Sequence, residues 1–468
     1  MPIPEKKSRV RPAAVRLAGL ILLAAFALAG AFTDTTLSGN DATRFAVIQA
    51  VGEQHVFHIE NTEFRSVDVV RKDGHVYSDK PLPLAWGLGM FHRLVPFRFT
   101  DHYALLVWLY NALAGFAVNA LVFWWMFNAF RRVRHGSLLL KGALALGCVG
   151  TTWLLSYSVL LNNHTPAALA VLGTYIMLEK FRRAPSDKLA AGIGAAAGMV
   201  AAFDIPLGGL CSLAAACAVW RMKEPKAAVL SAAGSGLVLL ACCALNFHAY
   251  GTWLPLYVAG DTGTYHPNLN FDLGYWFEAL AGYRGFFLYM PFLVLGMIPA
   301  RQESVPDRAM YGFALAGIAF YCLATDEFGG AAYGFRYLVP LIPVLYFRAG
   351  RMVLEHGSAR WKAGAGVLLL WGLAASLAGA YAPFCVAFEG HRSPPGHFTR
   401  VVRSSFGGNL LCASFEYAPD SALTQMLIRH YGPDNAYRFL YESAFNLKRP
   451  DLLRRTVERA KEHHDRTR

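Results

Sequence analysis

The sequence predicts an all-α polytopic membrane protein. Of its 468 residues, 55% are hydrophobic and 16% are charged, whereas soluble domains usually contain about 25% charged residues. The apolar residues fall in long runs, and a run of about 20 such residues is long enough for a helix to cross a bilayer. The net charge of +13 does not indicate nucleic acid binding, because most basic residues lie in short segments between these runs.

The first predicted span covers residues 14–33. Four basic residues, Lys6, Lys7, Arg9 and Arg11, precede it and predict a cytoplasmic N-terminus. The apolar run is long for a signal peptide and no convincing small-residue cleavage site follows it. Residues 1–33 are therefore predicted to form a retained signal anchor.

A long polar segment, residues 34–100, separates the first and second spans and is predicted to be an outer loop. A loop of this length among membrane spans is usually functional or disordered, and its apolar periodicity argues against disorder. Asn40 is predicted to cap a helix whose apolar positions recur at three-residue spacing from Phe45 to Val51. A second amphipathic stretch covers residues 82–94. We expect two helices that lie along the membrane surface, joined by a charged linker.

The remaining apolar runs predict a transmembrane bundle over residues 101–385, with about eleven spans in all. The single spans are predicted at 14–33, 103–130, 138–161, 165–180, 227–248, 285–300, 309–325, 335–347 and 363–385. The run from 189 to 220 is too long for one span and is interrupted at Asp204-Ile205-Pro206, which predicts two short helices. Residues 386–468 are polar and predict a small helical C-terminal appendage, which an odd number of spans places outside.

Nearly all basic residues fall in the loops that this alternation places in the cytoplasm. Arg284 and Arg336 are exceptions. Together with His164 and Asp204, they fall at the outer ends of spans. Ionisable residues near membrane depth tend to line cavities or pathways, and a guanidinium group suits a phosphate. The alternative is that these side chains only extend to the membrane interface.

Two acidic positions of the outer loop have a structural and a functional interpretation. Asp41 stands at the start of a predicted helix, where a carboxylate caps the helix or interacts with its dipole. Asp79 precedes Lys80 in what could be a solvated turn. The same two carboxylates could also serve a reaction centre.

The residues Glu53, His55, His58 and Glu60 are of types that bind metals, so a divalent metal is an option there, although the spacing is not specific. The sequence contains no P-loop, nucleophile elbow or cysteine-paired zinc signature. Gly192-Ile193-Gly194 follows no strand, so small residues there are expected to serve helix packing rather than dinucleotide binding.

Six short segments occur in the order found in the bacterial polytopic glycosyltransferases of the GT-C fold. They are Asn40-Asp41 with Arg44, GHVYSDKP (74–81), Asn163-His164-Thr165-Pro166, Asp204-Ile205-Pro206, YRGFFLYMPF (283–292) and FGGAAYGFRYLVPLIP (328–343). In this series the chain resembles that family, which includes the aminoarabinose transferases of lipid A and is related to the protein O-mannosyltransferases. The resemblance extends to about residue 350.

The resemblance implies a GT-C-like bundle in a bacterial inner membrane, with an active site on the periplasmic side. It implies transfer of a sugar from a polyprenyl-phosphate carrier to an envelope glycan, lipid or protein, with membrane lipid as a further partner. Asp41 is carried over as the catalytic carboxylate. The substrate-binding residues carried over are Asn40, Arg44, Asp79, Lys80, His164, Asp204, Arg284, Arg336 and Tyr337. Of these, Lys80, Arg284 and Arg336 are expected to contact phosphate.

Two other functions use the same residues. A transporter or lipid flippase would carry its charges at mid-span depth and contain inverted repeats, and no repeat is evident in the sequence. An inactive GT-C-like scaffold would bind the carrier lipid without turnover.

Overall fold

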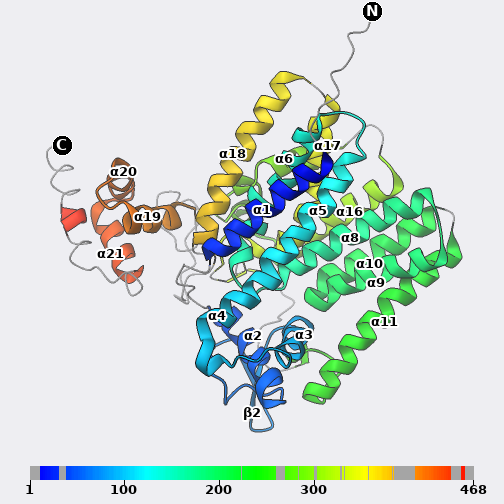
Figure 1. Ribbon diagram of the computed structural model, residues 1–468, viewed down its shortest axis with the longest axis horizontal. Coiled ribbons are helices and arrows are strands. Elements are labelled where there is room, and N and C mark those ends of the chain that lie inside the picture. The colour runs from blue at the N-terminus through cyan, green and yellow to red at the C-terminus, as the bar shows by residue number, and fades with distance from the viewer. Residues whose placement is uncertain are drawn as a thin grey trace, which may run out of the picture.

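The computed structural model describes residues 11–30, 38–222, 224–259, 269–282, 284–299, 303–326, 329–330, 332–356, 358–381, 383, 406–443 and 455–458. Three parts are distinguished in Figure 1: a large helical bundle, a loop domain (residues 38–98) at one end of it, and a C-terminal appendage (residues 406–443) beside it. We call the end of the bundle that carries the loop domain the loop face, and the opposite end the arginine face.

The bundle is built from helices of very different lengths. In chain order they are α1 (Pro12–Gly30), α4 (Phe99–Asn111), a π-helical turn (Ala112–Ala117), α5 (Val118–Arg131), α6 (Leu138–Gly150), α7 (Trp153–Ser156), a 3₁₀ turn (Tyr157–Val159), α8 (His164–Arg183), α9 (Asp187–Phe203), α10 (Ile205–Arg221), α11 (Pro225–Tyr250), α12 (Leu256–Ala259), α13 (Leu273–Leu280), α14 (Phe286–Tyr289), α15 (Phe292–Met297), α16 (Val305–Ala324), a second 3₁₀ turn (Arg336–Leu341), α17 (Ile342–His356) and α18 (Ala359–Tyr381). One apolar core runs through the bundle, with Trp153, Tyr157 and Phe181 almost fully buried in it.

Among the described residues, four helical stretches are long and apolar enough to cross a bilayer: 99–131, 225–250, 336–356 and 359–381. Helix α6 and the segment 153–159 that follows it would form a fifth span, bent by 51°. Helices α1 and α10 contain shorter apolar stretches. A helical, multi-pass membrane protein is therefore confirmed, whereas the total of about eleven spans stays a prediction.

Two of the predicted membrane elements differ in outcome. The break at Asp204 is confirmed, because α9 ends at Phe203 and α10 begins at Ile205. The single span predicted at 285–300 is wrong, because the chain forms the two short helices α14 and α15. Met290 between them has φ −129° and ψ 61°, and a residue before proline, here Pro291, is disfavoured in the helical region.

The loop domain contains α2 (Gly39–Gln49), a π-helical turn (Ala50–Gln54), the strands β1 (Val69–Lys72) and β2 (His75–Ser78), and α3 (Leu82–His92). Both predicted helices are present. The strands pair antiparallel, with Val69 opposite Ser78. They form a hairpin where the sequence predicts only a charged linker, so this part of the prediction is wrong. Asp73 and Gly74 at its turn both have positive φ (51° and 83°), as two-residue hairpin turns require.

Two predictions for α2 are wrong. Its N-cap is Ser38 rather than Asn40, because the Ser38 hydroxyl is the group that reaches the amide of the third helical residue. The helix does not lie on a membrane surface, because every residue from Asn40 to Gln49 is buried. Helix α3 and the start of α4 enclose it, and Phe45 packs against Phe64 and Phe99. Helix α3 does expose the apolar side chain of Phe91.

The appendage contains α19 (Phe406–Tyr417), α20 (Ala422–Tyr431) and α21 (Pro433–Ser443), which share a small apolar core. All three helices lie within residues 386–468, where the sequence predicts a small helical appendage. The appendage contacts the last turns of α18, where the Asn409 amide donates to the Ala378 carbonyl over 2.8 Å.

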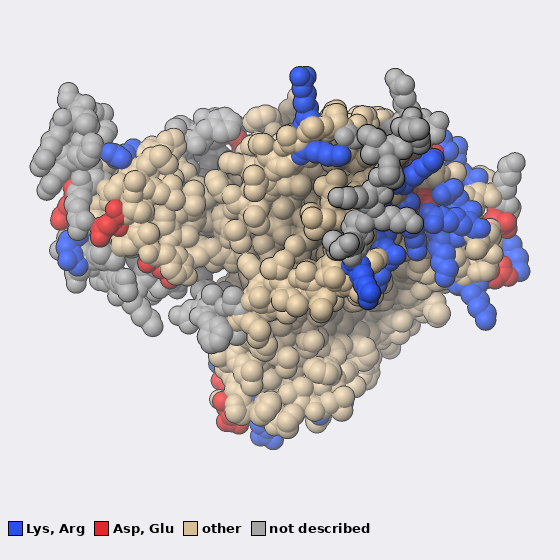
Figure 2. Space-filling view, turned by 45° about the horizontal axis from the view of Figure 1, so that its top comes forward, with Lys and Arg blue, Asp and Glu red and all other residues tan. Residues whose placement is uncertain are grey.

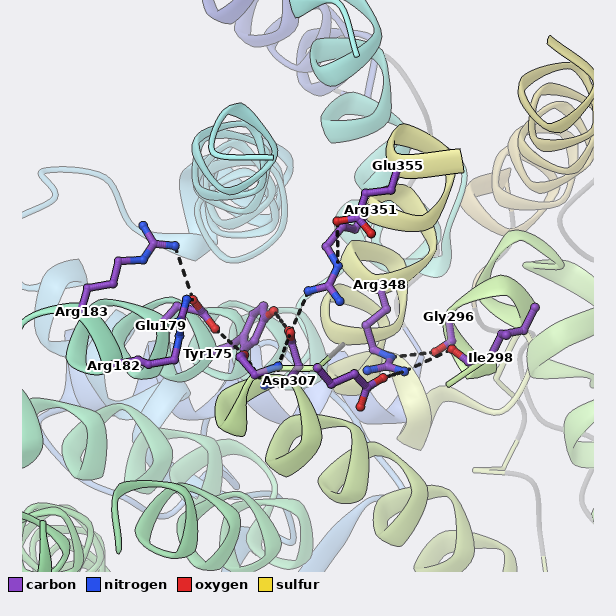
Figure 3. A network of polar contacts seen from close by, with 12 residues as sticks. Tyr175, Glu179, Arg182, Arg183, Gly296, Ile298, Asp307, Arg348, Arg351 and Glu355 are labelled. Atoms are coloured by element: carbon purple, nitrogen blue, oxygen red, sulfur yellow. Dashed lines mark hydrogen bonds and ion pairs between the residues drawn. The ribbon is translucent and has the colours of Figure 1, made fainter. Parts of the chain in front are cut away.

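Basic side chains gather on the arginine face, whereas the broad surface beside them in Figure 2 carries few charges. Salt bridges and hydrogen bonds connect three helices there, as Figure 3 shows. Arg348 of α17 pairs with Glu303 over 2.7 Å, and Arg351 pairs with Asp307 of α16 over 2.7 Å. Tyr175 of α8 donates to Asp307. We call these residues, with Glu179, the arginine-face network. A cavity of about 480 Å³ lies beside them.

Candidate functional site

The predicted site residues come from the loop domain and from the loop face of the bundle, and Arg44 connects the two parts. Its Nε donates to Oδ1 of Asn163 over 3.1 Å. Asn163 immediately precedes α8, and its own amide donates to the Phe203 carbonyl over 3.4 Å. A side chain of α2 is thus tied to the start of α8 and the end of α9.

The Arg44 guanidinium is buried and shares its surroundings with several charges. It also donates to the backbone carbonyl and the side-chain oxygen of Asn40. Burial lowers the pKa of Arg44 to about 10, and the positive charge of Arg336 adds to this, while Asp79, Asp41 and Asp68 oppose it. Arg44 therefore remains a cation at neutral pH.

Asp41 is only 2% exposed and belongs to a capping box. Its Oδ1 accepts from the amide and from the hydroxyl of Ser38, each over 2.6 Å. Within the described chain, its Oδ2 takes part in no hydrogen bond. Burial raises the pKa of the Asp41 carboxyl from 3.8 to about 6, and the Ser38 hydrogen bonds and Arg44 only partly offset this. The carboxylate can thus exchange a proton close to neutral pH.

The end of β2 delivers Asp79 and Lys80. The Lys80 ammonium lies 3.0 Å from Asp79 Oδ2 and 3.2 Å from Asp68 Oδ2. The other oxygen of Asp79 is buried and has no hydrogen-bond partner among the described residues. A buried oxygen of this kind is costly unless something else binds it, so the pair is not a fully solvated turn.

On the bundle side, His164, Asp204, Arg336 and Tyr337 lie together. His164 Nδ1 is 3.9 Å from Asp204 Oδ2, and the other Asp204 oxygen accepts from the Tyr321 hydroxyl over 2.6 Å. The Tyr337 ring packs edge-on against His164, with 5.9 Å between centroids. The Arg336 guanidinium lies 5.4 Å from the centroid of the Tyr337 ring.

The two sides act on one another electrostatically. The positive charges of Arg336, Arg44 and Lys80 all act on the imidazole of His164. Asp79 and Asp41 act on Arg44, as does Arg336. The structure therefore gathers residues from the loop domain and from α8, α10 and the segment before α17. We call them the loop-face cluster: Asn40, Asp41, Arg44, Asp68, Asp79, Lys80, Asn163, His164, Asp204, Arg336 and Tyr337.

Arg284 is placed differently from the other predicted phosphate ligands. Its guanidinium donates to the carbonyls of Gly330 and Ala332, with 3.0 Å to Gly330. Both Arg284 and Arg336 act electrostatically on Tyr157, so Arg284 lies near the cluster and supports the segment that leads to Arg336. A direct contact with phosphate stays a prediction for this residue.

The four residues considered for a metal do not assemble. Glu53 turns inward, where it pairs with His92 over 3.1 Å and accepts from the Phe99 amide. His55 ends the π-helical turn with φ 61°. Only His58 and Glu60 remain together, and His75 of β2 joins them.

Three members or neighbours of this cluster were not predicted from the sequence: Asn163, Asp68 and Tyr321. Asn163 stands in the segment that carried the resemblance, which was the available signal. Asp68 and Tyr321 had no local signal, because an acid before a strand and a tyrosine in an apolar helix are ordinary. The hairpin did have one: Asp73-Gly74 between two short strand-like runs is a typical hairpin sequence.

No protein-family model and no curated protein sequence matches this chain. Solved structures similar to it include the crystal structures of ArnT from Cupriavidus metallidurans bound to undecaprenyl phosphate and in the apo state. The bound structure has 16% identity and a TM-score of 0.52, and the match covers 94% of this chain and 77% of that one. The apo structure has 15% identity and a TM-score of 0.53, and the match covers 95% of this chain and 74% of that one. The expected resemblance is confirmed at the level of the fold.

Proposed function

We propose that this protein is a membrane glycosyltransferase that moves a sugar from a polyprenyl-phosphate carrier to an acceptor of the bacterial cell envelope. The proposal rests on one observation: a buried carboxylate with a raised pKa, Asp41, belongs to the same cluster as the cations Arg44, Lys80 and Arg336. Breaking a sugar–phosphate bond requires a base for the acceptor and positive charge for the departing phosphate.

In this mechanism Asp41 accepts the proton of the acceptor hydroxyl. The acceptor oxygen then forms a bond to the anomeric carbon, and the bond between that carbon and the phosphate oxygen breaks. The electron pair of the broken bond stays on the phosphate. A pKa of about 6 leaves Asp41 mostly ionised at neutral pH and lets it hold the proton after the transfer.

The leaving phosphate is assigned to Lys80 and Arg336. Charge-assisted hydrogen bonds from a guanidinium or an ammonium are about twice as strong as neutral ones. Lys80 is already held between Asp68 and Asp79, which fixes the ammonium without burying it. The hydrogen bond between Arg44 and Asn163 holds the loop domain against the bundle. His164, Asp204 and Tyr337 lie on the bundle side of the loop-face cluster.

The lipid carrier explains why such a cluster belongs at one end of a membrane bundle. A polyprenyl chain requires apolar surroundings, whereas its phosphate requires cations at the boundary. The solved ArnT structure with undecaprenyl phosphate has the same fold as this chain, which supports this substrate class. On this basis we place the loop face in the periplasm, and the positive-inside rule places the arginine face in the cytoplasm.

The test uses cells that carry the wild-type gene, the Asp41→Asn variant or no gene. Mass spectrometry of envelope lipids and glycans should find one sugar modification that the gene adds. We expect Asp41→Asn cells to lack the modification at an unchanged protein level and to retain the unused carrier-linked sugar. A modification unaffected by Asp41→Asn would refute the role of Asp41. Movement of the carrier lipid between leaflets in proteoliposomes, without sugar transfer, would refute the proposed function in favour of a flippase.

A further inference from the structure

A second group of side chains, His58, Glu60 and His75, lies in the loop domain and takes no part in the proposed transfer. His58 and Glu60 follow the π-helical turn, and His75 opens strand β2. We propose that these three residues bind one divalent transition metal ion of the zinc class.

The distances between the three side chains fit ligands of one metal ion. Glu60 Oε1 lies 3.0 Å from His58 Nδ1 and 2.7 Å from His75 Nδ1. Zinc bonds to imidazole nitrogen and carboxylate oxygen are about 2 Å long, so neighbouring ligand atoms lie on the order of 3 Å apart. All three candidate ligand atoms fall within 4.8 Å of one another.

The backbone fixes the carboxylate in place. The other oxygen of Glu60 accepts from the Val76 amide over 3.1 Å, and the Ile59 amide donates to the Val76 carbonyl over 2.8 Å. Oε1 is therefore held toward the two imidazoles by contacts on both sides of Glu60. Carboxylates that ligate a metal are usually oriented by a hydrogen bond from a neighbouring group, as the Val76 amide does here.

The imidazoles face the same oxygen, and one of them has an unused nitrogen. His58 Nδ1 is buried and makes no hydrogen bond of acceptable geometry within the described residues, although it lies close to Glu60. The two rings are stacked with 4.4 Å between centroids and 22° between planes. His75 is 47% exposed in its side chain and can turn, so a small rotation brings its Nδ1 lone pair onto the same ion.

The ligand set is a His₂Glu set that leaves one coordination position open to water. Two imidazoles and a carboxylate suit zinc, whereas calcium and magnesium take mainly oxygen ligands. The metal would join the segment after the π-helical turn to β2. Strand β2 ends at Ser78, directly before Asp79 and Lys80, so binding would rigidify the strand that carries these two residues.

The test measures zinc bound to the full-length, tag-free chain in detergent. The protein is stripped with a chelator, reloaded with Zn²⁺ and passed over a desalting column, and the metal is counted by inductively coupled plasma mass spectrometry. We expect about one zinc per chain for the wild type and for the exposed control His135→Ala, and at least tenfold less for His75→Gln. Glu60→Gln, which keeps an acceptor for the Val76 amide, should also lose zinc.

A second measurement keeps the proposal testable if a variant folds poorly. Zinc should raise the thermal midpoint of the wild-type protein and slow hydrogen exchange of the hairpin amides, and His75→Gln should show neither effect. The proposal is overturned if the wild-type protein retains no more zinc than the His75→Gln variant. Neither measurement involves sugar transfer, so failure here leaves the proposed function untouched.

Discussion

The loop-face cluster and the arginine-face network both place charged side chains between helices of the same bundle, but they complete their contacts differently. In the arginine-face network, Glu303 and Asp307 each have a guanidinium partner at 2.7 Å. In the loop-face cluster, Asp41 has no ion-pair partner within the described residues, and one oxygen of Asp79 is buried without a hydrogen bond.

This difference separates charges that hold helices together from charges that remain able to bind something else. Removal of one partner from a buried ion pair strongly destabilises a protein, because the other charge is left buried and unpaired. A buried carboxylate with a raised pKa is a typical feature of a functional site. Nη1 of Arg348 in the arginine-face network is also buried without a hydrogen bond within the described residues, so the contrast concerns the carboxylates. Burial of charge alone does not identify a site, whereas buried carboxylates that are incompletely paired do point to one.

The largest effect should come from Asp41→Asn. The loss of a general base usually reduces the rate by about 100-fold to 10,000-fold, and we expect this reduction in sugar transfer. The thermal midpoint should stay equal or rise, because at neutral pH the buried carboxylate disfavours the fold by on the order of 3 kcal/mol, the equivalent of a pKa shift from 3.8 to about 6.

Asp73→Asn serves as the control for Asp41→Asn. Asp73 is exposed at the hairpin turn, and asparagine tolerates its positive φ. This variant should keep wild-type transfer and stability. A variant Asp41→Asn that transfers sugar at the wild-type rate, measured with purified protein, would remove the distinction between the two regions.

The next effect concerns stability and comes from the arginine-face network. Arg351→Met leaves Asp307 buried without its guanidinium, which usually destabilises a protein by about 3–5 kcal/mol. Transfer per folded molecule should not change. Thermal unfolding in detergent measures this, with Arg182→Met as the control, because Arg182 is an exposed partner of Glu179 and such pairs contribute about 1 kcal/mol or less.

If Arg351→Met reduced transfer without lowering the thermal midpoint, the arginine-face network would belong to the functional machinery and the comparison would fail.

A smaller effect is expected from Lys80→Met. A hydrogen bond to a charged group contributes about 1.5–3 kcal/mol, so KM for the carrier-linked donor should rise roughly 10-fold to 100-fold. Steady-state kinetics over a range of donor concentrations measures this. Lys72→Met, on β1 of the same hairpin, should leave KM unchanged, and an equal change in both variants would indicate a general effect on the hairpin.

The smallest effect concerns pH. Transfer should fall about tenfold per pH unit below about pH 6, where Asp41 becomes protonated. Because the folded-state pKa is raised, the stability that Asp41 contributes is complete below about pH 3.8 and is lost as the pH rises through 6. The thermal midpoint of Asp41→Asn minus that of the wild type should therefore increase across this window.

A midpoint difference that stays constant between pH 4 and pH 7 would show that Asp41 is not buried as a carboxylate with a raised pKa.

The class of protein and several element boundaries could be predicted from local sequence. Long apolar runs with basic ends predict membrane helices because the hydrocarbon core of a bilayer excludes charge. This prediction does not depend on which other segments pack against the helix. The break between α9 and α10 was equally local, since Asp204 caps one helix and Pro206 can stand only near the start of the next. Helix α2 followed from its apolar spacing, and α3 lies within the stretch 82–94 that the sequence predicts to be helical.

The contacts between distant residues could be found only in the folded chain. Arg44 and Asn163 are 119 positions apart, and periodicity gives the face of a helix but not the partner on that face. For the same reason the sequence did not indicate that His75 lies beside His58 and Glu60. Nor did it indicate that Glu53 pairs with His92 instead. The pKa of Asp41 also depends on burial by other segments, because desolvation comes from surrounding atoms and not from the residue's own neighbours in sequence.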